Sequence, residues 1–159
     1  MNARHFPAPW GRKIWIITGA VSGGLLTVGV AMPLLLPVKE PDERWALWIV
    51  PVLLCLILVT TALWMIRGYS LTDDAVVIHR PLWVNRIPLD QINSVEVDSE
   101  ACRGAWKTIG NDGLFAMHGR FRSKRLGKFQ AYVTDPEQAV LLHVPGDVIV
   151  LSPENPRSF

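Results

Sequence analysis

The chain has 159 residues, half of which are apolar, and a formal net charge of only +2. Eleven Lys or Arg residues and eleven Asp or Glu residues follow Ile66, so this part of the chain is neutral, which argues against a general nucleic-acid-binding protein. The two cysteines, Cys55 and Cys102, have neither metal-ligand nor disulfide-framework spacing, and we expect both to be free thiols.

The chain begins with a basic flank, residues 1–13, that carries Arg4, Arg12 and Lys13 and no acidic residue. Residues 14–38 then contain no charge. This run is much longer than the apolar core of a cleaved signal peptide, which has about 7–15 residues. The pattern therefore predicts a first membrane span over about residues 14–36.

Small residues are spaced four apart in this first span. Gly19 and Gly23 form a GxxxG pair, and Ala20 and Gly24 form a second pair on the adjacent face. Small side chains let two helices approach closely. Two interpretations stay open: these residues pack against the second span of the same chain, or they contact another copy of the chain in a homo-oligomer.

The second apolar segment, residues 45–66, is 22 residues long and uncharged. At about 1.5 Å per residue a helix of this length reaches about 33 Å, which matches a hydrocarbon core of about 30 Å. Only the short polar loop of residues 39–44 lies between the spans, so residues 14–66 are predicted to form a transmembrane helical hairpin. Neither span contains a charged side chain, which argues against a proton or ion pathway.

Basic residues are more frequent on the two flanks of the hairpin than in the loop between its spans. By the positive-inside rule, the flanks then lie in the cytoplasm and the loop lies on the opposite side. The sequence thus predicts a multi-pass membrane protein with both termini in the cytoplasm. The flanking residues are Arg4, Arg12, Lys13, Arg67, Arg80 and Arg86, and the loop residues are Lys39 and Arg44.

From Gly68 onward the hydrophobic period changes from helical to two, which is the spacing of β-strands. About seven short strands separated by turn-forming residues predict a small antiparallel barrel or sandwich over residues 67–159. Residues 104–113 are rich in glycine and polar side chains and are interpreted as a turn region. Residues 153–159 are expected to begin one helical turn.

A set of turn-forming and core residues in this part of the chain carries a resemblance to a known family. The set comprises Tyr69-Ser70-Leu71-Thr72-Asp73-Asp74, Ile87-Pro88-Leu89 with Ile92, Gly110 with Gly113-Leu114-Phe115, Gly119 with Phe121, Leu126-Gly127 with Phe129, Ala131-Tyr132 with Thr134, and Val150-Leu151-Ser152-Pro153-Glu154 with Pro156 and Phe159. On these residues, segment 68–159 resembles the bacterial pleckstrin-homology-like (PH-like) domains, in particular the membrane-anchored type.

The resemblance implies a PH-like barrel or sandwich in which a carboxyl-terminal amphipathic helix caps one end. The sequence stops where that helix would begin, so we expect a truncated C-terminal helix. The end of the barrel then stays open or is covered by a membrane helix, a lipid or a partner. The resemblance also implies a binding module, here at the cytoplasmic face of the bacterial inner membrane.

Five cations with no acidic residue among them stand out between Asp112 and Asp135. A β-hairpin that pairs Phe121 with Phe129 places the cations of its strands on the face opposite the core. Two interpretations stay open: a solvated outer face, or a patch that faces anionic lipids of the inner leaflet. The five cations are Arg120, Arg122, Lys124, Arg125 and Lys128.

Candidate catalytic and metal-binding residues are few. The four histidines, His5, His79, His118 and His143, are scattered and lack the spacing of metal sites. Ser152 lacks the glycines that surround a nucleophilic serine in a nucleophile elbow. We therefore expect no metal, no cofactor and no enzymatic activity.

The sequence as a whole predicts a membrane-anchored PH-like binding module that acts as a protein–protein scaffold. The alternative is a module that senses anionic lipid through the basic hairpin of residues 120–128. An enzyme or an enzyme accessory subunit is a third interpretation, with less support. The expected partners are membrane lipids, another membrane or cytoplasmic protein and, in one interpretation, a second copy of the chain.

Overall fold

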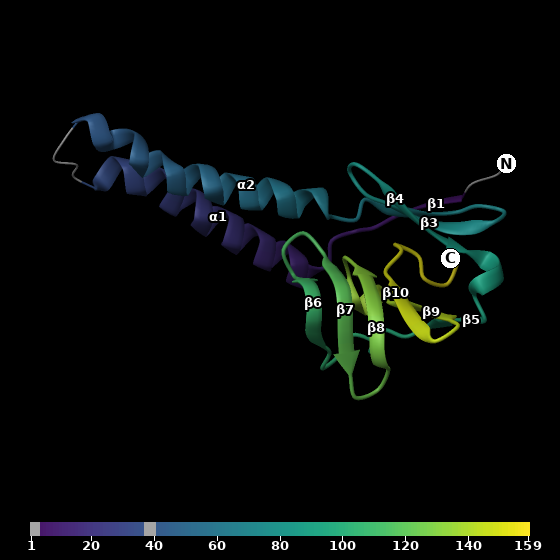
Figure 1. Ribbon diagram of the computed structural model, residues 1–159. Coiled ribbons are helices and arrows are strands. Elements are labelled where there is room, and N and C mark those ends of the chain that lie inside the picture. Colours follow the sequence, from purple (N-terminus) through teal and green to yellow (C-terminus); the bar gives the residue numbers. More distant parts are fainter. Residues whose placement is uncertain (1–3, 37–40) are drawn as a thin grey trace.

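The computed structural model describes residues 4–36 and 41–159, which form a long helical hairpin and a β-rich domain at its base (Figure 1). The helical elements are α1 (Arg12–Leu35), η1 (Pro41–Trp48), α2 (Ile49–Leu63), η2 (Leu89–Gln91) and η3 (Pro136–Gln138). The strands are β1 (Arg4–Pro7), β2 (Gly68–Leu71), β3 (Ala75–His79), β4 (Val84–Pro88), β5 (Ser94–Val97), β6 (Trp106–Asp112), β7 (Met117–Ser123), β8 (Gly127–Val133), β9 (Val140–Val144) and β10 (Asp147–Leu151). This architecture confirms the predicted fold class, with two sheets in a sandwich instead of a closed barrel.

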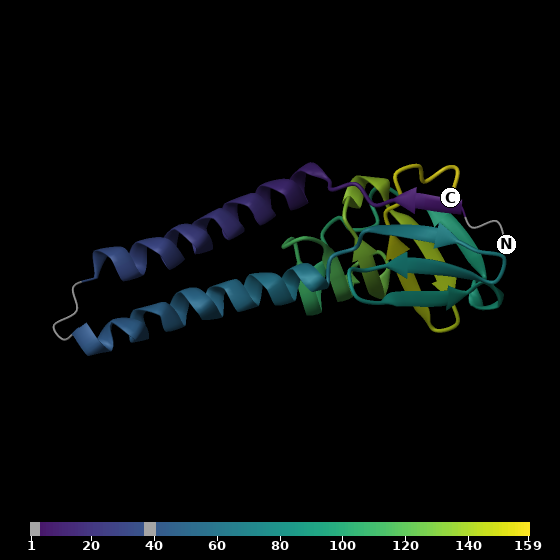
Figure 2. The same cartoon turned by 90° about the horizontal axis from the view of Figure 1, so that it is seen from above.

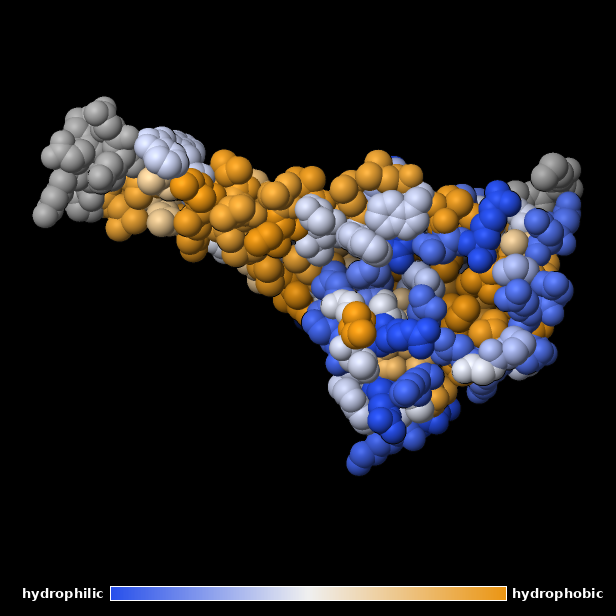
Figure 3. All heavy atoms as spheres, viewed as in Figure 1, coloured by the Kyte–Doolittle hydropathy of each residue, from blue (hydrophilic) through white to orange (hydrophobic). Residues whose placement is uncertain are grey.

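The hairpin consists of α1 and α2. Two helical stretches, Arg12–Leu35 and Trp45–Leu63, are long and apolar enough to cross a membrane, and most of their side chains are exposed. Figure 3 shows this apolar surface ending where the mainly polar surface of the β domain begins. Figure 2 shows that the two helices are close together near their far ends and farther apart where they meet the domain.

The predicted small-residue pairs lie away from the contact between the helices. A Cβ atom at Gly19, Gly23 or Gly24 would meet no other atom within 4 Å, whereas one at Gly29 would lie 3.8 Å from Cα of Pro51. Within the described residues, the close approach of α1 to α2 is therefore at Gly29 and not at the predicted pairs. Contact of Gly19, Gly23, Ala20 and Gly24 with a second copy of the chain stays a prediction.

The β domain consists of two sheets. The first has the strand order β1-β2-β3-β4, and the second has the order β5-β9-β10-β8-β7-β6. Strands β8 and β10 are parallel, with Val150 opposite Ala131, which corrects the prediction of a wholly antiparallel domain. After β8, the link through η3 places β9 two strands away from β8 in the sheet. The β9–β10 hairpin then places β10 between β9 and β8.

The predicted register of the β7–β8 hairpin is confirmed. Phe121 lies opposite Phe129, and the side chains of Phe121, Phe129, Ala131 and Val133 are all buried. A buried face on one side of a strand forces the intervening residues to the other side. The two sheets are also joined at the core, because the buried hydroxyl of Tyr69 in β2 donates to the carbonyl oxygen of residue 132 in β8 at 2.7 Å.

Part of the stretch that was interpreted as a turn region is strand β6. Gly110 of β6 lies opposite Gly119 of β7, and both have positive φ angles, of 130° and 119°. A Cβ atom on Gly110 would collide with the carbonyl oxygen of His118, and one on Gly119 with that of Ile109. The two glycines therefore allow a close approach of paired strands, whereas the sequence analysis placed Gly110 in a turn region.

A short strand, β1, precedes the hairpin and was not predicted. It lies within the predicted basic flank and pairs antiparallel with β2, so that Phe6 is opposite Tyr69. Phe6 is buried in the core of the domain. The helical hairpin is therefore inserted between two strands that are hydrogen-bonded neighbours.

The last residues of the chain form turns instead of the predicted helical turn. The backbone N–H of Glu154 donates to the carbonyl oxygen of Pro7 at 3.0 Å. The ring of Phe159 packs edge-on against Phe6, with 5.0 Å between centroids, and lies 6.3 Å from the ring of Tyr69. These contacts cover the core beside β1.

Replacing Phe6 by Ala removes a ring that is only 8% exposed. Large-to-small changes at buried aromatic residues cost about 3–5 kcal/mol, so we expect Phe6→Ala to lower the free energy of unfolding of the β domain by about 3 kcal/mol. Arg4→Ala replaces an exposed residue of the same strand and is expected to change the free energy of unfolding by less than about 0.5 kcal/mol. Denaturant unfolding in mild detergent measures both. Equal stability of the two variants would contradict the assignment of β1 to the domain.

The contact between Gly29 and Pro51 gives a second prediction. An Ile side chain at position 29 does not fit in this contact, and overpacking of this kind costs about 1–3 kcal/mol. Gly29→Ile should therefore push α1 and α2 apart. Gly23→Ile adds the same side chain where a Cβ atom meets nothing, and it should leave the spacing unchanged. Distances between spin labels on α1 and α2, obtained by electron paramagnetic resonance, measure the spacing of the helices. A wider distance in the Gly23→Ile chain than in the Gly29→Ile chain would contradict the described packing.

Candidate functional site at the base of the hairpin

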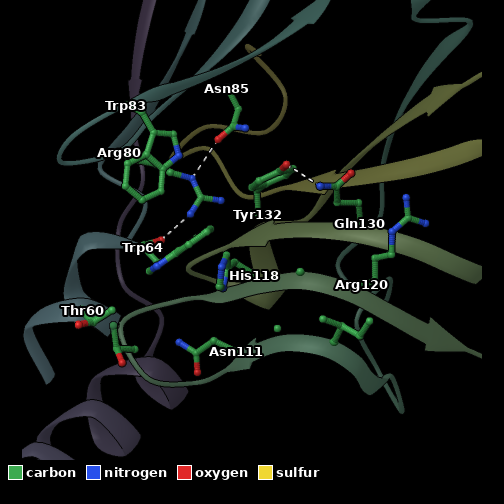
Figure 4. A pocket seen from close by; sticks show the side chains of 14 residues that line it. Thr60, Trp64, Arg80, Trp83, Asn85, Asn111, His118, Arg120, Gln130 and Tyr132 are labelled. Carbon is green, nitrogen blue, oxygen red and sulfur yellow. Dashed lines mark hydrogen bonds between the residues drawn. The ribbon is translucent and has the colours of Figure 1, made fainter. Parts of the chain in front are cut away.

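Arg80 joins the end of α2 to the β domain. It directly follows β3, and the residue is only 7% exposed. Its Nη1 donates to the carbonyl oxygen of Trp64, the C-cap residue of α2, at 2.9 Å, and its Nε donates to Oδ1 of Asn85 at 3.1 Å (Figure 4). The carbonyl end of a helix carries a partial negative charge. Arg80 therefore holds this end by both a hydrogen bond and its charge.

Three aromatic rings surround the guanidinium group of Arg80. Its Cζ atom lies 5.4 Å from the ring centroid of Trp64, 5.6 Å from that of Trp83 and 5.2 Å from that of Tyr132. Trp64 and Trp83 also pack edge-on, with 5.0 Å between centroids. In the described part of the chain Arg80 forms no ion pair with a carboxylate. Its buried charge is therefore balanced by ring faces and neutral oxygens.

The base of α1 is joined to the turn between β6 and β7. The hydroxyl of Thr18 donates to the carbonyl oxygen of Gly113 at 3.2 Å and accepts from the backbone N–H of Phe115 at 2.8 Å. Phe115 has a φ angle of 64°, which a bulky side chain rarely adopts. The bond to Thr18 holds the turn in this conformation, and both helices are thus connected to the domain by side-chain hydrogen bonds.

A cavity of about 710 Å³ lies between the end of α2 and the two sheets. Its wall combines the last turn of α2, the β3–β4 hairpin and the outer faces of β6, β7 and β8. Figure 4 shows Arg80, His118 and Tyr132 around its interior. The lining residues are Thr60, Thr61, Trp64, Arg80, Trp83, Asn85, Ile109, Gly110, Asn111, His118, Gly119, Arg120, Gln130 and Tyr132.

The cavity is electropositive. Among the fourteen described residues that line it, Arg80 and Arg120 are cations and none is acidic. Burial lowers the pKa of Arg80, but a guanidinium keeps its proton at neutral pH. Burial, together with the nearby charge of Arg80, lowers the pKa of His118 to about 4. His118 is therefore neutral at pH 7, and its buried Nδ1 has no hydrogen-bond partner among the described residues.

The five predicted cations lie at and beyond this cavity. Arg120 is part of its lining, and Arg122 lies opposite Lys128 one step farther along the β7–β8 hairpin. Lys124 and Arg125 lie in the turn that follows β7. Two of the five contact acidic residues: a nitrogen of Arg125 is 2.9 Å from an oxygen of Asp98, and one of Arg120 is 3.7 Å from an oxygen of Asp147.

Two of the four histidines are not scattered but neighbours. Nδ1 of His5 lies 3.1 Å from the hydroxyl of Ser70, and that hydroxyl lies 2.8 Å from Nε2 of His79. The two histidines are brought together because β2 pairs with β1 on one side and with β3 on the other. The sequence analysis did not predict the pairing of β1 with β2. Within residues 4–36 and 41–159, no group of three His, Cys, Asp or Glu side chains is arranged to hold a metal ion.

Sequence reasoning missed the centre of the site. Trp64, Arg80 and Trp83 come from different parts of the chain, and each is ordinary where it stands in the sequence. One signal was available, because Arg80 begins a β-turn that also contains Trp83 and follows a strand that is almost wholly buried. Buried strands seldom end in a charged residue that stays buried.

The sequence model of the bacterial PH domain family matches residues 67–159. The match includes every cavity residue that the β domain contributes, but it includes neither β1 nor the hairpin. Comparisons with curated proteins and with solved structures found no significant match.

The environment of His118 gives a testable pKa. Nuclear magnetic resonance of histidine-labelled protein should show His118 titrating near pH 4, well below the usual 6.5. The unfolded chain then binds this proton at a higher pH than the folded chain, so this residue's contribution to stability is lost as the pH falls from about 6.5 towards 4. A His118 that titrates near 6.5 would contradict the burial of its ring beside Arg80.

Proposed function

We propose, since the chain belongs to the bacterial PH domain family, that it is a binding and assembly module anchored in the inner (cell) membrane. In this proposal residues 14–66 cross the bilayer as a hairpin, and the PH-like domain of residues 67–159 lies at the cytoplasmic face. The basic flank of residues 1–13 lies at the same face. The domain then binds another membrane or cytoplasmic protein.

The exposed surface of the hairpin supports the membrane anchor. Leu34 and Leu35 are 74% and 77% exposed, and apolar side chains are exposed along both helices. An apolar surface of this extent marks a membrane or protein contact. Tryptophan favours the interface between membrane and water, and six of the seven tryptophans lie near the two ends of the hairpin. These six are Trp10, Trp15, Trp45, Trp48, Trp64 and Trp83.

The single observation that carries the proposed topology is the pairing of β1 with β2. These strands flank the hairpin and are hydrogen-bonded neighbours, so both ends of a membrane-crossing hairpin must emerge on one side of the bilayer. The excess of basic residues on the flanks favours the cytoplasmic side. The domain is then attached to the membrane at two points, through α1 and through α2.

The free edges of the second sheet support a protein partner. Strands β5 and β6 are the two edge strands of this sheet. They expose apolar side chains, namely Val95 and Val97 on β5 and Trp106 and Ile109 on β6. An edge strand with exposed apolar side chains can accept a strand from another chain.

A second candidate function is the sensing of anionic lipid by the basic hairpin of residues 120–128. It is favoured by the position of Arg120, Arg122 and Lys128, whose strand positions lie opposite the buried face of β7 and β8. Each cation close to an anionic leaflet contributes about 1 kcal/mol. PH-like domains generally act as non-catalytic binding modules, and the proposal assigns no catalytic residue and no cofactor.

Reporter fusions test the topology. A reporter that is active only in the cytoplasm should work when fused before Met1 and when fused after Phe159, because β1 and the β domain lie on the same side. The same reporter inserted in the loop of residues 39–44 should be silent. Activity at only one terminus would overturn the proposed hairpin topology, and activity only in the loop would overturn the cytoplasmic location.

A further inference from the structure

We propose that the cavity at the base of the hairpin, whose lining includes the cations Arg80 and Arg120, binds the phosphate group of an anionic membrane lipid. This inference rests on the proposed function, because the lipid reaches the cavity only if the hairpin crosses the bilayer. It assigns the lipid a binding site, the cavity beside the end of α2, that neither the fold nor the family match supplies.

The charges of the cavity favour an anion. Arg80 is buried and has no carboxylate partner among the described residues, and Arg120 is paired only loosely with Asp147 at 3.7 Å. Since no acidic residue is among the described residues that line the cavity, a bound phosphate would compete with the carboxylate of Asp147 for Arg120 and with no carboxylate of the lining for Arg80. Guanidinium groups match the geometry of phosphate oxygens and form charge-assisted hydrogen bonds with them.

The neutral donors of the cavity fit the same ligand. His118 has a buried Nδ1 without a partner in the described structure, and a buried polar atom of this kind indicates a ligand or water position. The side-chain amides of Asn111 and Gln130 also line the cavity. A phosphate oxygen within reach of His118 would give its ring nitrogen an acceptor.

The position of the cavity favours a lipid over a soluble anion. One wall is the last turn of α2, where the membrane-spanning stretch ends at Leu63. The hydroxyls of Thr60 and Thr61 on this wall already donate to the carbonyl oxygens of residues 56 and 57, at 2.6 and 2.7 Å. These threonines therefore offer mainly methyl groups to a ligand. A lipid with its phosphate at Arg80 would place its glycerol and first methylene groups against this wall.

The register of β7 and β8 separates the cavity from the rest of the basic surface. Along the outer face, His118 is opposite Tyr132, Arg120 is opposite Gln130, and Arg122 is opposite Lys128. The first two pairs line the cavity, whereas Arg122 and Lys128 do not. Arg120 and Arg122 lie on the same face of the same strand, so they are matched positions inside and outside the proposed site.

The experiment titrates the full-length chain in an uncharged detergent and follows the His118 ring signals by nuclear magnetic resonance. Three probes are used: short-chain phosphatidylglycerol, an anionic phosphodiester lipid; short-chain phosphatidylcholine, which has the same phosphate but no net charge; and inorganic phosphate. We expect phosphatidylglycerol to bind at least about tenfold more tightly than either of the others. We also expect it to raise the pKa of His118, since a nearby anion stabilises the protonated ring.

Two variants test the site. Arg120→Gln should weaken the binding of phosphatidylglycerol about tenfold or more, because it removes one of two charge-assisted contacts. Arg122→Gln removes the same charge two residues away and should change the affinity by less than about twofold. Neither residue is buried, so both variants are expected to fold. The signals of His5, His79 and His143, which lie outside the cavity, report on unrelated changes in each sample.

The outcomes separate this inference from the proposed function. Equal weakening by Arg120→Gln and Arg122→Gln would overturn the cavity as the site and favour lipid sensing by the whole basic hairpin. Inorganic phosphate binding as tightly as phosphatidylglycerol would overturn a lipid as the ligand. Failure of all three probes to move the His118 signals would overturn the inference entirely. The reporter fusions decide the membrane topology independently of each of these results.

Discussion

The pairing of β1 with β2 is the constraint on which the rest of the structure depends. It closes the domain across an inserted segment of about sixty residues, so both ends of the helical hairpin must return to neighbouring strands. A tether at one helix would leave a domain free to rotate, whereas a domain held between two helices has a fixed face towards the hairpin. The apolar ring of Phe6 packs into the core and so attaches β1 to it, and the ring of Phe159 covers that of Phe6.

Arg80 extends this constraint from the backbone to the side chains. By bonding the carbonyl oxygen of Trp64 it fixes the end of α2 against the first sheet, and the contact of Thr18 with the β6–β7 turn fixes α1 against the second. The cavity arises because three parts of the fold meet at this point: the end of α2 and the two sheets. A cation in such a place has little water to stabilise it, so aromatic ring faces and neutral oxygens take that role.

Local patterns in the sequence were sufficient for much of the fold. The apolar runs predicted both helices, and alternation around Phe121 and Phe129 predicted the β7–β8 register. Contacts between distant segments were not predictable in this way. Strand β1 is only four residues long and ends in Pro7. Strand β6 was interpreted as a turn region, although its Gly110 is needed for the close approach of the neighbouring strand β7. The cavity beside Arg80 forms only in the tertiary fold. Its lining residues come from separate segments of the chain and follow no pattern that could be recognised in the sequence.

Hydrogen exchange of the backbone amides of β1, measured on the full chain in lipid nanodiscs, tests the central claim most directly. If β1 is a strand of the domain, the amides of this segment that are bonded to β2 should exchange as slowly as those of β2 and β3, because all open only when the domain unfolds. If the amides of residues 4–6 instead exchange as fast as those of a flexible tail while β2 and β3 stay protected, the domain is held by α2 alone. That result would contradict the two-point attachment of the domain to the hairpin.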